Sequence, residues 1–193
     1  MGHTQQVKGW LTELNDFREH PAWKTLCPGA VHLIERFIGG LEEMPTDSRA
    51  NVVGPFTAAI NSLLKERGIT VDETPLTIRV IEELFKRPDI SFVHGKVQWV
   101  IEIKTGLEWN SLGAAVLEGL AFKAKFVLLC LYAKAGRGDL LSALEACGVG
   151  HAFDHTFVLS RTADTWDVYF DNFAKNLNTF VNELPGDKLA SMI

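Results

Sequence analysis

The chain has 193 residues, of which 47% are apolar, and this is enough for one domain with its own buried core. No opening stretch has the charged, apolar and small-residue order of a signal peptide, and the most apolar run, residues 126 to 133, is far shorter than the about 20 residues that cross a bilayer. We therefore expect a cytoplasmic protein with no membrane partner.

The net charge of −5 argues weakly against a nucleic-acid partner, but the charges are unevenly distributed along the chain. Residues 86 to 137 include eight basic and four acidic side chains and so carry +4, which leaves −9 for the remainder. This asymmetry is compatible with an ordinary solvated surface, and equally with a basic face that binds a polyanion.

Apolar residues at helical spacing predict one helix over residues 30–44 and another over 56–67, the second with a terminating glycine at Gly68. The next stretch, 69–86, is ambiguous. Its first part resembles a short strand, and its second part, "PLTIRVIEELF", could be a strand that runs into a helix. The spacing of its apolar residues favours a helix in the second half.

From Asp89 the pattern changes to alternation, which predicts a strand over 90–93, a tight turn at residues 94–96, and a second strand over 97–104. Side chains two apart in a strand share a face. Glu102 and Lys104 therefore project together. The opposite face, which we expect to anchor the strand in the core, carries Val97, Trp99, Ile101 and Ile103.

Further elements follow in alternation. We expect a helix over 110–124 with Leu112, Val116, Leu117 and Leu120 at helical spacing, and then a strand over 125–133 that is covered on both faces. The remaining pattern predicts a helix over 139–146, a strand over 155–160, a possible strand over 165–170, and a final helix over 173–184. This order is typical of a mixed α/β layer fold.

The predicted hairpin has a chemical consequence. Asp89 begins one strand and Glu102 lies near the end of the next, so the turn brings the two carboxylates together. Mg²⁺ prefers oxygen ligands and keeps several waters, so one or two carboxylates are enough to hold it. Lys104 could then help to deprotonate the attacking water and stabilise developing negative charge. Such a set is suited to phosphodiester hydrolysis.

Pro88-Asp89, a gap of 12 residues, and then Glu102-Ile103-Lys104 resemble the motif of the PD-(D/E)xK nuclease superfamily, over roughly residues 56 to 132. The resemblance implies a restriction-endonuclease-like three-layer α/β fold, with a central mixed β-sheet flanked by helices. It also implies a single nuclease domain, 1–193, with a helical part over about 1–55 and a catalytic core over about 56–184.

By this resemblance, Asp89 and Glu102 would be metal ligands, the main-chain carbonyl of Ile103 a further ligand, and Lys104 the catalytic lysine. The cofactor would be Mg²⁺, with Mn²⁺ able to substitute. Family members often add an acid from a preceding helix, for which Glu35 and Glu66 are candidates. Contacts to the DNA backbone would come from the basic segment, namely Lys86, Arg87, Lys96, Thr105, Lys123 and Lys125.

The glutamine and tyrosine motif of exonuclease-like members is absent after the lysine. The resemblance therefore favours a type II restriction enzyme that cuts duplex DNA as a homodimer, because one such site cuts one strand. A junction or repair nuclease is an alternative. So is a non-catalytic DNA-binding or interaction subunit that keeps the fold. The plainest alternative is that Glu102 and Lys104 form an ordinary solvent-facing pair.

Overall fold

A computed structural model gives the structure of the chain, and it describes residues 2–44, 52–73, 77–81, 84–106, 109–133, 152–161 and 163–186. The helix predicted over 139–146 lies outside these residues. The chain divides into two compact units, which we call the helical unit (Met1–Gly68 with Asp164–Ile193) and the sheet unit (Ile69–Ala163). No helix within the described ranges is both long and apolar enough to cross a membrane.

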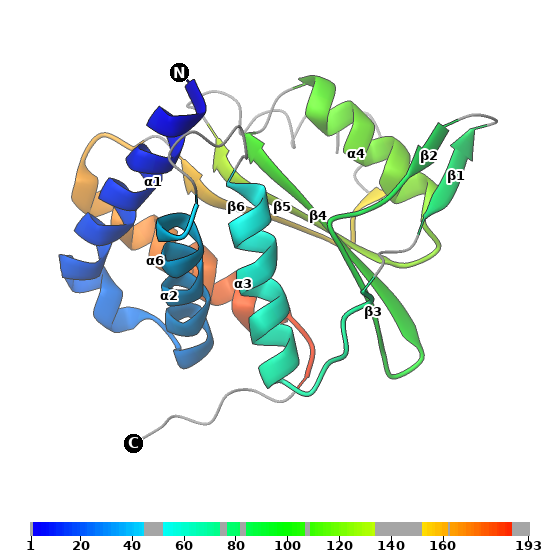
Figure 1. Cartoon of the computed structure of the whole chain (residues 1–193), viewed down its shortest axis with the longest axis horizontal. Coiled ribbons are helices and arrows are strands. Elements are labelled where there is room, and N and C mark those ends of the chain that lie inside the picture. The colour runs from blue at the N-terminus through cyan, green and yellow to red at the C-terminus, as the bar shows by residue number, and fades with distance from the viewer. Residues whose placement is uncertain are drawn as a thin grey trace. The chain divides into compact units, whose positions relative to one another are not determined.

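The helical unit contains four α-helices and one short 3₁₀ helix in its described residues (Figure 1): α1 (Gly2–Glu19), η1 (Pro21–Thr25), α2 (Pro28–Glu42), α3 (Val53–Glu66) and α6 (Trp166–Glu183). The helices predicted over 30–44 and 56–67 are confirmed as α2 and α3. Each buries an apolar stripe, with Phe37 of α2 and Phe56 of α3 in edge-on contact at 4.8 Å between ring centroids.

Helix α6 confirms the final helix predicted over 173–184 but begins earlier, so the strand predicted over 165–170 is wrong. Thr165 is the N-cap, and its hydroxyl accepts a hydrogen bond from the N–H of Val168 at 3.3 Å. Tyr169, Phe170 and Phe173 are then buried at helical spacing. A threonine N-cap followed by apolar residues at helical spacing is a signal for the start of a helix. This signal outweighs the preference of the aromatic residues for a strand.

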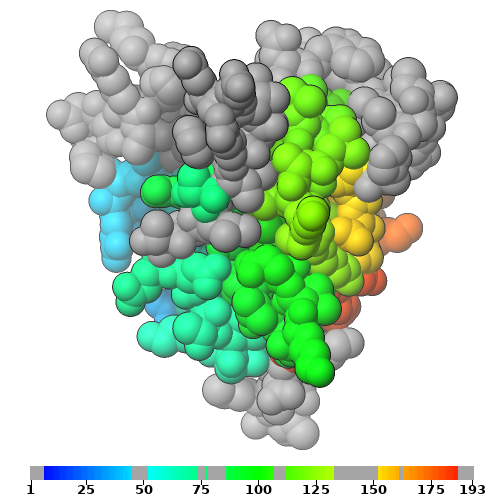
Figure 2. Space-filling model, turned by 90° about the vertical axis from the view of Figure 1, so that its right-hand side faces the viewer, coloured from blue at the N-terminus to red at the C-terminus, as the bar shows by residue number. Residues whose placement is uncertain are grey.

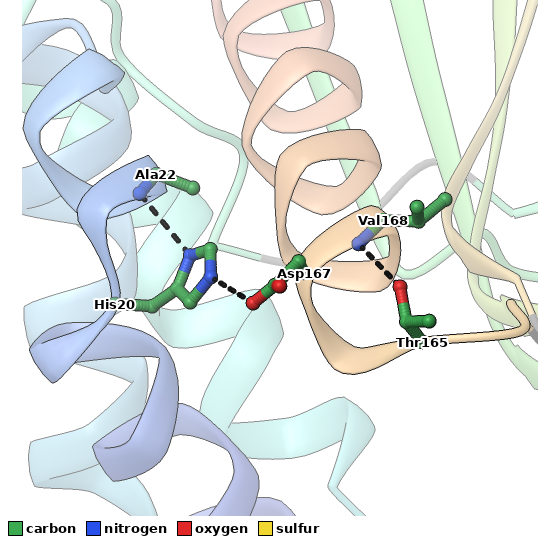
Figure 3. Close-up of polar contacts among 5 residues, drawn as sticks. All are labelled: His20, Ala22, Thr165, Asp167 and Val168. Atoms are coloured by element: carbon green, nitrogen blue, oxygen red, sulfur yellow. Dashed lines mark hydrogen bonds and ion pairs between the residues drawn. The ribbon is translucent and has the colours of Figure 1, made fainter.

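Polar contacts hold both ends of α6 within the helical unit. His20 Nδ1 accepts the N–H of Ala22 at 3.2 Å, so the ring proton lies on Nε2, which is 3.0 Å from Asp167 Oδ1 (Figure 3). At the other end the buried guanidinium of Arg67 donates to two main-chain carbonyls of the C-terminal turn, each at 2.9 Å. Arg67 thereby satisfies carbonyl groups that a helix leaves unpaired at its C-terminal end.

The sheet unit is built on a four-stranded mixed sheet in the order β3-β4-β5-β6 (Figure 1). Its strands are β3 (Ile90–His94), β4 (Val97–Gly106), β5 (Lys125–Ala133) and β6 (His155–Arg161). The first pair is antiparallel and the other two pairs are parallel. Helix α4 (Trp109–Ala121) makes the crossover between β4 and β5. The chain is therefore a mixed α/β protein, and the strands predicted from residue 90 to residue 160 are confirmed.

The helix predicted in the second half of "PLTIRVIEELF" is wrong. This stretch forms an antiparallel hairpin of β1 (Ile78–Ile81) and β2 (Leu84–Lys86). Three of the four residues in β1 are β-branched, which favours an extended backbone over a helix. The short strand expected in the preceding stretch is reduced to a single bridge between Val71 and Phe92.

Strand β4 is buried on both faces over Trp99–Ile103, which differs from the expectation of one core face and one polar face. Val97, expected in the core, is 47% exposed, whereas Glu102, expected on the polar face, is only 7% exposed. The cause is the central position of β4 between β3 and β5, with α4 packed against the Glu102 face.

Helix α4 covers this face through small and aliphatic residues. Leu112 and Ala115 pack against Leu128 and Cys130 of β5, which the parallel register places beside Glu102 and Lys104 of β4. In contrast, Leu117 and Leu120 are 55% and 51% exposed. The buried face of α4 therefore differs from the predicted apolar stripe. The outward surface of the helix is yellow-green in Figure 2.

We expect Gly119→Ala to destabilise the protein even though alanine is the better helix former. A Cβ atom at Gly119 would lie 2.2 Å from the carbonyl oxygen of Ala152, and such overpacking costs about 1 to 3 kcal/mol. In the matched control, Gly113→Ala, the new Cβ meets no atom of the described residues within 4 Å. The control should gain up to about 1 kcal/mol. Urea unfolding measures both, and equal stabilities would contradict the close approach of α4.

Candidate active site

The β3–β4 hairpin places Asp89 opposite Glu102. Ile90 pairs with Ile101, and Asp89 lies one residue before Ile90, so the register extends to Glu102. Asp89 Oδ2 accepts the main-chain N–H of Ile103 at 2.7 Å, which fixes the carboxylate against β4. Residues opposite each other in an antiparallel pair share a face. The two acids therefore meet at one end of the hairpin and on one face of the sheet.

Glu102 is an acid in a place where acids are rarely found. It is 7% exposed, its Oε1 is in close ion-pair contact with Lys104 Nζ, and its Oε2 is buried without a hydrogen-bond partner among the described residues. The reading of this pair as an ordinary solvent-facing pair is therefore wrong. An unpaired buried carboxylate oxygen costs about 1 to 3 kcal/mol or more, and a cation or a proton at this atom would offset that cost.

Electrostatics at the site favour protonation of the acids. Burial raises the pKa of Glu102 to about 7, helped by the charge of Asp89, and the contact with Lys104 does not offset these effects. Burial also raises the pKa of Asp89, and this effect outweighs the hydrogen bond from the N–H of Ile103 and the charge of Lys104, which both lower that pKa. Both carboxylates would become easier to ionise if a cation were bound between them.

Lys104 is held in its charged form. Burial alone would lower its pKa, but Glu102, and then Glu118 and Asp89, outweigh burial and raise the pKa above its ordinary value. An ammonium with a raised pKa does not readily accept a proton at neutral pH. In this geometry Lys104 places a positive charge beside Glu102, and the general-base part of its expected role loses support.

Glu118 of α4 is a member of the cluster that the sequence pattern did not identify. It is 3% exposed, and its Oε1 lies 3.1 Å from Lys86 Nζ at the end of β2. Its charge also acts on the pKa of Asp89, Glu102 and Lys104. The signal that could have found it is its place between Ala115 and Gly119, because small residues mark the helix face that packs on a sheet.

The two acids that were candidates from the preceding helices have partners inside the helical unit. Glu35 forms a bidentate ion pair with Arg18. Glu66 Oε2 lies 3.2 Å from His32 Nδ1. Among the described residues of the sheet unit, Glu118 joins the cluster as an additional acid, and it follows the Glu102 strand in the chain.

The six residues expected to contact DNA are spread over the sheet unit. Lys86 joins the cluster through Glu118. Arg87 is exposed, with Nε 3.5 Å from the Thr77 hydroxyl. Thr105 is half-buried, and alternation along β4 turns it to the face opposite Lys104.

The other three basic residues lie toward the opposite end of the strands. Lys96 is exposed in the β3–β4 turn, six residues and about 20 Å along β4 from Glu102. Lys125 Nζ sits 4.3 Å from the centroid of the Trp99 ring, a cation–π contact on the face away from Glu102. Lys123 is exposed just before β5.

The donor atoms at the site fit a divalent cation that keeps part of its water shell. Glu102 Oε2 is buried and has no partner in the described part of the chain. Within the described residues no group of three His, Cys, Asp or Glu side chains has a metal-binding arrangement. Mg²⁺, however, often takes only one or two carboxylates. The carbonyl of Ile103 points to the same side of β4 as its N–H, which is the side of Asp89.

The chain has no match among protein-family models, curated proteins or solved structures. The PD-(D/E)xK resemblance therefore rests on Pro88-Asp89 and Glu102-Ile103-Lys104 alone. The chemistry of the site follows from the burial, charge and contacts of these residues.

We expect Glu102→Gln to reduce a loss of stability that the unmodified protein shows as the pH rises. The pKa of Glu102 is raised from 4.5 to about 7 in the folded protein, so between these values the folded state holds a proton that the unfolded chain releases. Without added metal, the free energy of unfolding should fall from pH 5 to pH 8, by up to about 1.4 kcal/mol per unit of pKa difference.

The measurement is urea unfolding at pH 5 and pH 8 for the unmodified protein, Glu102→Gln and Glu43→Gln. Glu43 is exposed and serves as the matched control, so its variant should keep the full pH-dependent fall. If Glu102→Gln and the unmodified protein lost stability in parallel, Glu102 would not be the group with the raised pKa.

Proposed function

We propose that this protein is a Mg²⁺-dependent DNA endonuclease of the PD-(D/E)xK type, with a restriction-endonuclease-like core in the sheet unit. The observation that carries the proposal is the buried Glu102 carboxylate, which lies between Asp89 and the charged Lys104 and has an Oε2 atom unpaired within the described residues. A buried carboxylate next to a second carboxylate needs positive charge, and a divalent cation supplies it.

Each residue has a separate task in this proposal. Asp89 and Glu102, with the main-chain carbonyl of Ile103, would hold Mg²⁺, and Mn²⁺ could substitute because it takes the same oxygen ligands. A bound cation would polarise the phosphate and acidify the attacking water. Lys104, kept protonated by its acidic neighbours, would bind a phosphate oxygen and stabilise the charge that develops there.

The combination of charges supports a phosphodiester substrate. The two carboxylates would hold a cation, and the ammonium group of Lys104 faces the same point. Together they would bind an anion that can also act as a metal ligand, and a phosphate group is such an anion. The mixed sheet supports the assignment, because a central mixed β-sheet is part of the fold that the resemblance implies. That the nucleic acid is DNA, and duplex DNA in the first instance, follows from the resemblance.

We expect Mg²⁺-dependent cleavage of supercoiled plasmid, abolished by EDTA. Glu102→Ala and Lys104→Met should each lower the rate by about 10²-fold or more, because each removes a charge that acts on the reacting phosphate. Lys175→Met and Asp171→Asn change exposed residues of α6 and should cleave at the unmodified rate. Cleavage by Lys104→Met at the unmodified rate would contradict the assigned site.

The same assay separates the alternatives. A gel shift without cleavage on plasmid, junction and damaged substrates would favour a non-catalytic DNA-binding subunit. Cleavage confined to junctions or damaged sites would favour a repair nuclease over a restriction enzyme.

We also propose that the active form is a homodimer, because a two-fold pair of sites cuts both strands of a duplex and a single site cuts one. Sedimentation velocity in the presence of DNA and Mg²⁺ should show two chains per duplex. Plasmid should then be converted to linear product with little nicked intermediate. A single chain on the duplex and a product that stays nicked would contradict the dimer and leave the phosphodiesterase proposal standing.

A further inference from the structure

Five ionisable groups gather at the candidate site within the described part of the sheet unit, and four of them form two ion pairs. Lys104 pairs with Glu102, and Lys86 pairs with Glu118 at 3.1 Å. The burial is graded: the side-chain exposures are 4% for Glu118 and 10% for Glu102, against 19% for Lys104 and 37% for Lys86. The acids therefore lie inside, and the two ammonium groups lie closer to solvent.

The second pair is linked to the first by the fold. Lys86 ends β2, three residues before Asp89, while Glu118 lies on the helix that packs over β4. Their contact joins the β1–β2 hairpin to α4 and so fixes the segment that carries Asp89. The second observation that points to a ligand is the buried Glu102 Oε2, which no described residue contacts by a hydrogen bond.

Formal charges limit how many cations this cluster can accept. Asp89, Glu102 and Glu118 contribute three negative charges, and Lys86 and Lys104 contribute two positive charges, so the cluster carries −1. One divalent cation and one phosphodiester would bring the total to zero. A second divalent cation would leave +2, and no acid of the cluster would be free to hold it, because Glu118 is already paired with Lys86.

Building on the proposed function, we infer that the site binds a single divalent cation, and that the Lys86 ammonium, held by Glu118, takes the position of a second one. Lys86 and Glu118 are positioning residues in this arrangement. Glu118 is kept from ligating metal by its ion pair, and Lys86 supplies fixed positive charge at the more exposed side of the cluster.

The test measures how many Mn²⁺ ions the full-length protein binds without DNA at pH 7.5. Electron paramagnetic resonance detects the free Mn²⁺, and the bound ions are obtained by difference. The unmodified protein should bind one Mn²⁺ per chain. Lys86→Met makes the cluster −2 and frees Glu118, so it should bind two. The double variant Lys86→Met/Glu118→Gln restores −1 and should return to one. Lys175→Met, which removes an exposed lysine of α6, should bind one.

Far-ultraviolet circular dichroism checks that each variant is folded. The double variant lacks the same lysine as Lys86→Met but has the net charge of the unmodified cluster, so it distinguishes an effect of charge on Mn²⁺ binding from an effect of altered packing. Two Mn²⁺ per unmodified chain would overturn the single-cation inference and leave the metal-dependent function intact. A single Mn²⁺ on folded Lys86→Met would overturn it in the same way. No binding by the unmodified protein would overturn both the inference and the proposed function.

Discussion

The burial of one carboxylate, that of Glu102, is the constraint on which the rest of the site depends. Strand β4 is central in the sheet and covered on both faces, so an acid on it is removed from water. The backbone has no freedom to move this side chain outward, because the strand is paired on both sides. A buried carboxylate is tolerated when its charge is neutralised. The contact with Lys104 and the raised pKa of Glu102 neutralise only part of this charge. In the proposed function, a divalent cation supplies the remaining positive charge.

The fold meets this constraint through the way α4 approaches the sheet. Gly119 allows the helix to come within contact of the Ala152 carbonyl, and this close packing brings Glu118 onto the sheet beside Asp89, Glu102 and Lys104. Lys86 then compensates Glu118 from the β1–β2 hairpin. Stability and the proposed function are therefore opposed here. A core filled with apolar residues at these positions would be more stable, and it would lose the ability to hold charge.

The sequence allowed the strands of the sheet and the pairing of Asp89 with Glu102 to be predicted, because alternation and turn residues define a hairpin locally. It did not allow the burial of Glu102 to be predicted, since that depends on α4, which packs from elsewhere in the chain. Glu118 was missed for the same reason: its helix has apolar residues on two sides, and Leu117 and Leu120 are the exposed ones. The β1–β2 hairpin was assigned to a helix because a short apolar run satisfies both periods.

The central claim is that Glu102 and Asp89 share a divalent cation. The most direct measurement is anomalous diffraction from crystals of the protein soaked in Mn²⁺, in which the scattering of the metal locates it without reference to activity. We expect an anomalous peak within ligand distance of Glu102 Oε2 and the Asp89 carboxylate, which disappears in crystals of Glu102→Gln. A fully soaked crystal with no peak at these oxygens, or with a peak that persists in Glu102→Gln, would contradict the claim.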